Sequence, residues 1–268
     1  MNKLLLQIFA IILLFFCIWF ALSKIDWVSV FKIEQTTSNT EKKLGDLFWE
    51  LIQKSQKEAY SKQVTSTIDS LVSKICESND IDKSTVKVHI IENSEVNAFA
   101  LPNKHLILYT GLILASANEA ELCGVISHEL AHMEKNHVMK KLIKEVGLSV
   151  LISMTAGKGG TDIIRGAAKH LSSSAYDRNL EKEADIAAVD YMVKANIDPE
   201  AFANFLYQFV DSESREGHLM TWVSTHPGSR ERAEYIIEYS KGKSKKSESI
   251  LTQASWEKLK AILIDSEI

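Results

Sequence analysis

The segment from Val125 to His137 contains three histidines and two glutamates in an otherwise apolar stretch. His128 and His132 are four residues apart. On a helix, where each residue turns the chain by about 100°, they lie on the same face one turn apart. Two imidazoles in this arrangement can bind one metal ion together. Glu129 is adjacent to the first histidine and can reach a water in an open metal position, so the spacing is typical of a catalytic zinc site.

A catalytic zinc site needs a third protein ligand. In one known arrangement that ligand is a histidine six residues after the second one, but position 138 holds Val138. His137 lies roughly 140° around the helix from His132. We therefore interpret His137 as a helix-end residue or as a hydrogen-bonding neighbour of a ligand.

The better candidate for the third ligand lies in the acidic segment "YDRNLEKEADIAAVDYM", which is predicted to be a helix. Glu181 and Asp185 are four residues apart and share a face, whereas Glu183 points about 200° away from Glu181. One carboxylate of such a pair can bind the metal while the other hydrogen-bonds a ligating histidine. We expect Glu181 to be the ligand and Asp185 the partner; an ordinary charged helix face is the alternative.

Four motifs follow one another along the chain, namely "NAFALPNKHLILYTGLI", "HELAH", "RNLEKEADIAAVDYM" and "THPGSRERA". In this order the chain resembles the membrane-associated zinc metalloendopeptidases that include the CAAX prenyl protease, the bacterial protease HtpX and periplasmic relatives. The resemblance implies a gluzincin-type site, with one Zn²⁺ ion on His128, His132 and Glu181 and with Glu129 as the catalytic base. It also implies a substrate-binding strand along the cleft, formed by Asn97, Ala98, Phe99 and Ala100.

His226 stands in a turn-like segment before Pro227 and Gly228. A lone histidine in such a loop is usually structural or exposed, but in the resembling family the His-Pro pair and an arginine matching Arg232 lie beside the active site. His226 is therefore a candidate catalytic residue with two open roles. It could occupy the open zinc position and keep the enzyme latent, or it could stabilise the oxyanion during turnover. We favour the latent-state role.

The remaining sequence must position these residues. Apolar residues recur at helical spacing from Glu41 to about Cys76 and again after Gly111. Between them, three short runs (86–91, 97–101 and 105–110) are typical of strands, and the last two are joined by a short turn. We expect an α+β fold: a mainly helical, zincin-like metalloprotease domain with a small antiparallel sheet. The apolar run 146–156 is too short to span a bilayer and predicts a buried helix rather than a membrane-dipping one.

The chain begins with an apolar run from Leu4 to Leu22. At about 1.5 Å per residue, this run nearly spans a hydrocarbon core of about 30 Å. We expect an uncleaved transmembrane anchor, because the run exceeds the usual signal-peptide core; a cleaved signal segment is the alternative. The expected organisation is an anchor or signal segment (1–23), a juxtamembrane linker (24–40), a zinc metallopeptidase domain (41–240), and a lysine-rich linker with a C-terminal helix (241–268).

Composition narrows the choice of partners. The net charge of -4 supplies no basic field, which argues against nucleic-acid binding. The spacing of the three cysteines is not that of a metal-binding motif. A disulfide between Cys76 and Cys123 is possible if the domain lies in an oxidising compartment. The predicted partners are protein or peptide substrates bound in extended form, and a membrane bound through the N-terminal segment.

We therefore expect a zinc-dependent metalloendopeptidase that cleaves membrane or envelope proteins, above all misfolded ones. The expected location is the bacterial inner membrane with the domain in the periplasm, or the periplasm or exterior if the N-terminal segment is cleaved. A catalytically silent, membrane-tethered zinc-binding adaptor or chaperone is the alternative. The intact Glu129 argues against that alternative, because an adaptor needs no general base.

Overall fold

The computed structural model describes residues 12–13, 33–59, 61–157, 160–210, 221–243 and 247–266. The chain divides into two units, residues 1–41 and residues 42–268, and the second contains every candidate site residue. Apart from Ile12 and Leu13, the apolar run from Leu4 to Leu22 lies outside the described residues. Within the described ranges, no helix combines the length and the apolar character needed to cross a bilayer.

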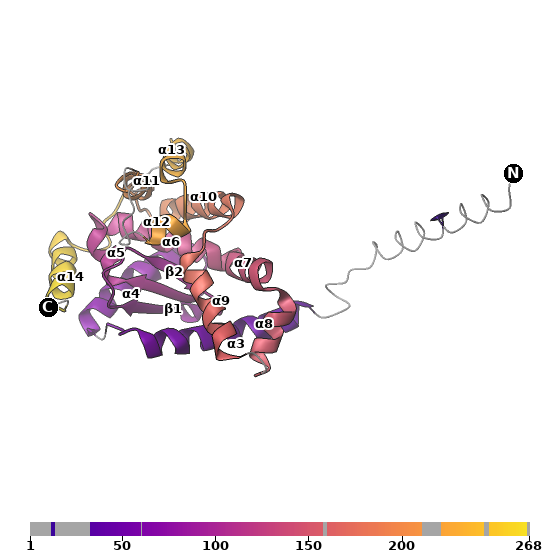
Figure 1. The fold of residues 1–268 in the computed structure, drawn as a ribbon. Coiled ribbons are helices and arrows are strands. Elements are labelled where there is room, and N and C mark those ends of the chain that lie inside the picture. Colours follow the sequence, from indigo (N-terminus) through magenta and orange to yellow (C-terminus); the bar gives the residue numbers. More distant parts are fainter. Residues whose placement is uncertain are drawn as a thin grey trace, which may run out of the picture. The chain divides into compact units, whose positions relative to one another are not determined.

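A three-stranded sheet runs through the second unit (Figure 1). It consists of β1 (Lys87–Ile91), β2 (Ala98–Leu101) and β3 (His105–Tyr109), in the order β1-β3-β2. β2 and β3 are antiparallel, as their short connection predicts, but β1 and β3 are parallel. The expectation of a wholly antiparallel sheet was therefore wrong. The sequence reveals the strands but not their order, and β2 lies at the edge, so that two strands running in the same direction become neighbours.

The register determines which backbone groups of β2 face outward. Tyr109 N–H donates to the carbonyl of Asn97 at 3.1 Å, and Phe99 lies opposite Ile107. Hydrogen-bonded and non-hydrogen-bonded pairs alternate along an antiparallel ladder. Ala98 and Ala100 therefore direct their N–H and C=O groups away from β3, toward the edge of the described sheet. The side chains of all four residues of β2 are buried.

Helices cover the sheet on both sides (Figure 1). The part of α3 (Ile33–Ser55) that belongs to the second unit covers one face, where the Trp49 ring stacks on His89 of β1 with centroids 3.5 Å apart. α6 (Glu119–Glu134) lies on the other side and packs against β2. α6 is buried from Glu121 to Met133, because it also contacts other helices of the core.

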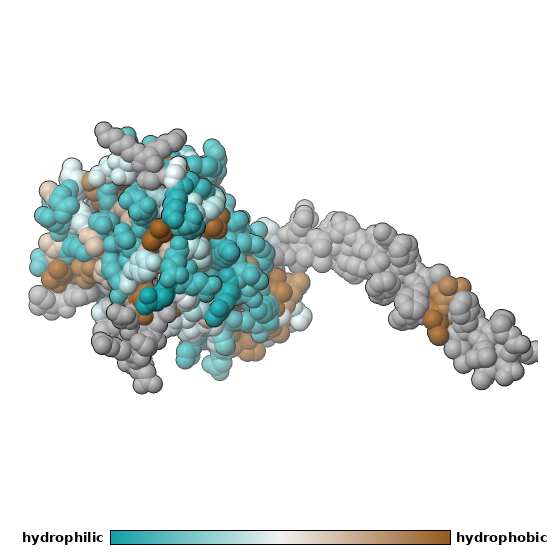
Figure 2. Space-filling view, turned by 90° about the horizontal axis from the view of Figure 1, so that it is seen from above, coloured by the Kyte–Doolittle hydropathy of each residue, from teal (hydrophilic) through white to brown (hydrophobic). Residues whose placement is uncertain are grey.

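The other helices complete the mainly helical architecture that the sequence predicts. They are α4 (Lys62–Ser78), the short 3₁₀ helix η1 (Lys83–Thr85), α5 (Thr110–Ala115), α7 (His137–Val146), α8 (Leu148–Thr155), α9 (Thr161–Ser173), α10 (Arg178–Lys194), α11 (Glu200–Tyr207), α12 (Thr221–Thr225), α13 (Ser229–Ser240) and α14 (Gln253–Ser266). The face seen in Figure 2 is largely hydrophilic, with only scattered apolar patches on the folded unit.

One expectation about local packing was wrong, and one possibility is not realised. The run 146–156 is not one buried helix, because Gly147, at φ 88°, separates α7 from α8, and α8 buries only Leu151 and Met154. Cys76 and Cys123 are buried and free, so they do not form a disulfide.

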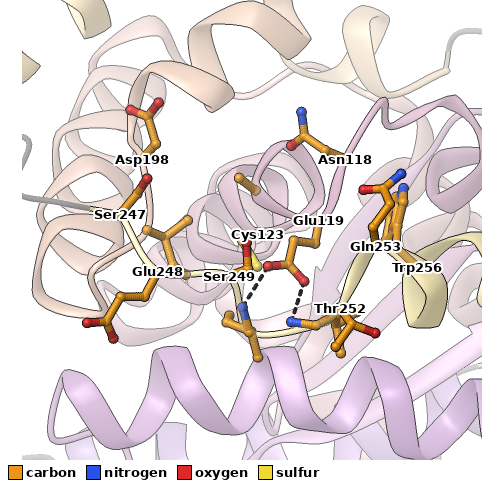
Figure 3. Close-up of a pocket in the computed structure, with 14 residues that line it drawn as sticks. Asn118, Glu119, Cys123, Asp198, Ser247, Glu248, Ser249, Thr252, Gln253 and Trp256 are labelled. Atoms are coloured by element: carbon orange, nitrogen blue, oxygen red, sulfur yellow. Dashed lines mark hydrogen bonds between the residues drawn. The ribbon is translucent and has the colours of Figure 1, made fainter.

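The C-terminal segment is fastened to the first turn of α6. Both oxygens of Glu119 accept backbone N–H groups, from Ile250 and from Leu251, each at 2.7 Å (Figure 3). Farther along, the Lys260 ammonium donates to the carbonyls of Leu114 and Ser116 at the end of α5. These contacts attach α14 to the same helices that lead into the candidate site.

Candidate metal centre

The helix that carries the HExxH motif begins and packs for local reasons. Asn118 caps α6, its side chain accepting the N–H of Glu121 at 3.0 Å. Gly124 allows α11 to approach closely, because a Cβ at this position would lie 2.5 Å from the Cβ of Phe202. The same close approach places the Phe202 ring beside His128, with ring centroids 5.7 Å apart. The histidine pair is therefore held on a tightly packed helix.

The acidic helix is α10, which is capped by Asp177 and packs against α6. Glu181 and Asp185 are buried and face α6, whereas the Glu183 side chain is 56% exposed. Helical spacing in the sequence therefore distinguished the two buried carboxylates from the exposed one correctly.

Four side chains converge at the interface of these helices: His128, His132, Glu181 and His226. Each offers one ligand atom, and these atoms all lie within 4.8 Å of one another. The Nε2 atom of His128 lies 2.9 Å from Nε2 of His132 and 3.2 Å from Nδ1 of His226. The latter atom lies 2.9 Å from Oε1 of Glu181. All four residues are at most 2% exposed.

The chemistry of these donors fits a zinc ion. Zinc prefers imidazole nitrogens and carboxylate oxygens in tetrahedral sites. Nδ1 of His128 lies 2.8 Å from Oδ1 of Asp185, which assigns the ring proton to Nδ1 and leaves the Nε2 lone pair directed into the cluster. Several lone pairs packed together in a dry interior are costly unless a cation neutralises them.

An arginine supports the carboxylates of this cluster. The Arg232 guanidinium donates two hydrogen bonds to Asp185, at 2.7 and 2.8 Å, and Tyr235 O–H donates to the same carboxylate. A further nitrogen of Arg232 lies 3.0 Å from Glu181. Burial by itself raises the pKa of Asp185, but the charges of Arg232 and His128 outweigh it and hold this pKa well below its usual range. Asp185 is therefore ionised, as a partner of a ligating histidine should be.

Glu129 lies in the same buried region. Its Oε1 accepts the indole N–H of Trp222 at 3.0 Å and lies 3.4 Å from Nε2 of His226. Burial raises the pKa of Glu129 to about 7, against the lowering effects of His132 and the Trp222 hydrogen bond. A carboxylate with a pKa near the ambient pH is well suited to accept and return a proton.

His137 lies beside the cluster rather than in it. Asn136, in the left-handed conformation at φ 57°, separates α6 from α7 and turns His137 back toward the site. Its Nδ1 lies 3.0 Å from Nδ1 of His132, and its Nε2 lies 3.1 Å from Glu183. Both interpretations offered by the sequence match this geometry, because His137 is the first residue of α7 and its ring is a hydrogen-bonding neighbour of His132.

Aromatic residues that the sequence did not single out enclose His226. The Trp222 ring stacks on it at 4.7 Å, and the Tyr176 ring stacks on both His132 and His226, at 4.1 and 5.4 Å. The N–H of Tyr176 donates to Thr225, which fixes the ring next to α12. The spacing of Trp222 and His226, four residues apart, could have indicated a shared face, but Tyr176 carries no such signal.

The predicted substrate strand lies beside these residues. Asn97 is 2% exposed, and the N–H of Trp222 donates to the carbonyl of its neighbour Val96 at 3.0 Å. Ala98, Phe99 and Ala100 form most of β2, which packs against α6. The structure thus brings the three groups of predicted residues into one region: the metal cluster, Glu129 and the strand.

A HExxH helix and a buried glutamate on a later helix together define a metallopeptidase type of site. Residues 62–240 match the family model of peptidase family M48, and the chain belongs to that family. The family and the His-His-Glu-His cluster together identify the cofactor as one zinc ion.

Named relatives agree with this membership. The chain is 31% identical to the mitochondrial metalloendopeptidase OMA1 of Bos taurus over 163 residues, which cover 56% of the chain and 31% of OMA1. It is 23% identical to the beta-barrel assembly-enhancing protease of Yersinia pestis over 201 residues, covering 70% of the chain and 41% of that protein. The Escherichia coli K12 protein of that name is 24% identical over 199 residues, with the same coverage. The chain thus spans less than half the length of these relatives. The finer resemblance to the CAAX protease and HtpX stays a prediction.

Proposed function

We propose that the chain is a zinc-dependent metalloendopeptidase that cleaves membrane or envelope proteins, above all misfolded ones. The observation that carries the proposal is the convergence of His128, His132 and Glu181 beside the buried Glu129 in a member of family M48. Relatives named as metalloendopeptidases and as enhancers of beta-barrel assembly support peptide hydrolysis and a substrate among envelope proteins.

In this proposal His128, His132 and Glu181 hold the zinc ion. Bound zinc lowers the pKa of a water molecule and polarises the carbonyl of the scissile peptide. Asp185 keeps His128 in the tautomer that presents Nε2 to the metal. Arg232 keeps Asp185 and Glu181 ionised and in place through its contacts with both carboxylates.

Glu129 acts as the general base. It accepts the proton of the attacking water and passes it to the nitrogen of the leaving amine, so that no covalent enzyme intermediate is needed. Trp222 holds the Glu129 carboxyl in position through the indole N–H. The pKa of about 7 keeps a substantial fraction of the carboxylate ionised at neutral pH in the zinc-free chain.

His226 is the fourth donor, and we assign it to a latent state. Its imidazole is 1% exposed and lies 2.9 Å from Glu181 and 3.2 Å from His128, so it could supply a fourth ligand to a bound zinc ion. The Arg232 guanidinium donates to the His226 carbonyl at 2.7 Å and fixes the backbone there, while the Trp222 and Tyr176 rings stack on the imidazole. With His226 as a fourth ligand, a tetrahedral zinc ion would have no position for water until this segment moved.

Substrate binding is assigned to the edge of β2. The outward N–H and C=O groups of Ala98 and the outward C=O of Ala100 can pair with an extended peptide, which then adds as another strand, whereas the N–H of Ala100 donates to Glu129. Main-chain pairing of this kind depends little on side chains, which suits a protease for unfolded proteins. Asn97 precedes these residues, and Phe99 lies between them and lines a cavity.

The N-terminal segment 1–23 is proposed as the membrane attachment, either retained or cleaved, and the domain 41–240 as the catalytic part in the periplasm. The linker 24–40 would connect them, and 241–268 would brace the domain through α14. The family membership supports the catalytic assignment for most of the central range.

A casein-degradation assay with the purified chain tests the proposal. We expect cleavage that a chelator abolishes and that added zinc restores. Glu129→Gln should abolish cleavage while zinc stays bound, because the amide keeps the shape but cannot accept the proton. Zinc-loaded wild type that binds unfolded casein without cutting it would establish the adaptor instead. Retention of a tenth of wild-type activity in the variant would rule out Glu129 as the base.

A further inference from the structure

A cavity of about 360 Å³ opens between the end of α3, the sheet and α9. Its lining residues come from the end of α3, from Phe99 and Tyr109 of the sheet, and from α9, which contributes Arg165, Ala168 and Lys169. The volume lies at the lower end of the range of about 300–1,000 Å³ found for ligand pockets. The cavity can therefore take one large side chain and part of a neighbour.

The cavity reaches β2 from the face that a substrate side chain would share. Phe99 lies between Ala98 and Ala100, whose backbone groups point outward, so a strand added to this edge would place one residue opposite Phe99 in a non-hydrogen-bonded pair. Side chains of such a pair lie on the same face and close together. That substrate side chain would therefore point into the cavity lined by Phe99 and Tyr109.

The floor of the cavity is apolar and aromatic, with one polar end. The Phe99 and Tyr109 rings meet edge to face at 5.9 Å. The Gln56 amide donates to the Tyr109 hydroxyl at 3.1 Å, and its buried Oε1 has no hydrogen-bond partner among the described residues. A buried acceptor of this kind calls for a donor. An aromatic side chain with a hydroxyl would satisfy both the apolar floor and this acceptor.

The rim of the cavity is positively charged. Lys54, Arg165 and Lys169 line it, all three are exposed, and none of its described lining residues is acidic. Arg165 and Lys169 are four residues apart on α9, so they lie on one face of that helix. Among the described residues, the carboxylate nearest to the Arg165 guanidinium is that of Asp162, which lies 3.9 Å away and is 99% exposed. The rim therefore favours a negatively charged group beside the occupant.

We propose that this cavity is a specificity subsite that accepts a large aromatic side chain of the substrate and draws an adjacent acidic residue against Arg165 and Lys169. The proposal rests on the proposed peptidase function and names its substrate class: extended segments in which an aromatic residue neighbours an aspartate or glutamate. The subsite lies at the surface while the metal ligands are buried. It can therefore select a segment before the zinc site opens.

Internally quenched peptides test this subsite with the wild-type chain in its zinc form. In a parent peptide that is cleaved, residues on each side of the cut bond are changed one at a time to Tyr, Phe or Ala. At one position we expect kcat/KM to be about 10- to 100-fold higher for an aromatic residue than for Ala, from about 1.5–3 kcal/mol of side-chain burial. Beside that position, Glu should exceed Lys by about two- to tenfold, and added salt should reduce this ratio.

Charge reversal at the rim provides the second test. The double variant Arg165→Glu, Lys169→Glu should reverse the Glu-over-Lys preference and leave the aromatic-over-Ala ratio in place. The matched control is Arg178→Glu with Lys258→Glu, which reverses two exposed cations outside the cavity and should change neither ratio. Ala168→Trp should fill the cavity and lower the aromatic preference.

Two outcomes separate the subsite from the proposed function. Chelator-sensitive cleavage with equal rates for aromatic and Ala peptides at every position would overturn the subsite alone. An unchanged Glu-over-Lys ratio in the charge-reversed variant would remove the rim from the proposal. Absence of any zinc-dependent cleavage by the wild type would overturn the proposed peptidase function and the subsite with it.

Discussion

Two histidine pairs among the described residues, one buried and one partly buried, have similar neighbours and different geometry. His128 and His132 lie on α6 beside Glu181, whereas His89 and His105 lie on adjacent strands beside Glu58. In both pairs the ring nitrogens approach to 2.9 Å. Within the part of the chain that the structure describes, the first pair alone belongs to a group whose ligand atoms all lie close together.

The second pair forms a chain rather than a cluster. Glu58 lies 3.2 Å from Nδ1 of His89, whose Nε2 lies 2.9 Å from Nδ1 of His105. The remaining nitrogen of His105 lies 3.1 Å from the Lys87 ammonium. Each ring nitrogen therefore already has a partner, and no lone pairs are left to converge on a common point.

The difference shows what turns histidines into a metal site. In the first region Asp185 takes one ring nitrogen of His128, and Arg232 fixes Asp185, so the other nitrogen is free to face Glu181 and His226. In the second region the ring nitrogens of His89 and His105 contact each other, Glu58 and Lys87, so none is free to bind a metal. A metal site needs ligand atoms that have no other partner and that point toward one position, and a similar number of histidines and carboxylates is not enough.

The largest effect on this comparison should come from Glu181→Gln. Structural zinc is bound with about 10–16 kcal/mol, which shared among four ligands predicts a loss of about 10²–10³-fold in zinc affinity. Competition with a chromogenic chelator measures it. Glu183→Gln and Glu58→Gln are matched controls that remove an exposed neighbour of His137 and a carboxylate of the second pair. Equal losses in Glu181→Gln and Glu183→Gln would mean that the third ligand has been misassigned.

A smaller loss is expected for Asp185→Asn. The amide can still hold a ring N–H through its oxygen, but it has no charge to match Arg232 or to increase the basicity of His128. Removal of such a partner lowers metal affinity by about 10- to 100-fold. The same titration checks it, with Asp190→Asn, a carboxylate on α10 that pairs with Lys243, as the control. An affinity equal to that of wild type would show that Asp185 serves folding only.

The sequence was sufficient where local spacing determines geometry. The face shared by His128 and His132, and the separation of Glu181 from Glu183, follow from helical periodicity alone. It was insufficient where distant segments meet: it gave neither the parallel pairing of β1 and β3 nor the enclosure of His226 by Trp222. The His89 and His105 pair depends on that same unpredicted strand order. Such contacts depend on tertiary packing, which no local pattern records.

The second histidine pair should make the free energy of unfolding depend on pH. Burial lowers the pKa of His105 to about 4, and Lys87 and His89 add to this. The folded pKa lies below the unfolded value of about 6.5, so the unfolded state binds more protons between these values and stability is lost as the pH falls. Between pH 7.5 and pH 5 we expect a loss of about 2 kcal/mol in the free energy of unfolding.

Urea unfolding of wild type and His105→Gln at both pH values measures this loss. The variant should be less stable than wild type at pH 7.5. Its free energy of unfolding should fall less between pH 7.5 and pH 5 than that of wild type, and the difference between the two falls should be about 2 kcal/mol. His170→Gln is the control, because the His170 side chain is 63% exposed. In the zinc-loaded chain the first pair is kept deprotonated by the metal, so the contrast isolates the second pair. Parallel pH slopes for wild type and His105→Gln would refute the assignment.

The smallest expected effect comes from His226→Ala, which tests whether the fourth donor of the first cluster restrains the enzyme. Its imidazole lies among the ligand atoms and is covered by Trp222 and Tyr176, so removing it should open the metal to water. If the covered state holds about nine-tenths of the molecules, casein cleavage should rise by about tenfold, and zinc should bind slightly less tightly.

The opposite outcome for the same variant has an equally definite meaning. A fall in kcat of about 10²–10³-fold with unchanged zinc content would make His226 a donor to the oxyanion. Wild-type activity and wild-type zinc content together would exclude both roles. His137→Ala is the matched control, since its ring contacts His132 from outside the cluster and a change there should not uncover the metal. A comparable increase in that variant would attribute the effect to loosened packing around α6, not to a vacated ligand position.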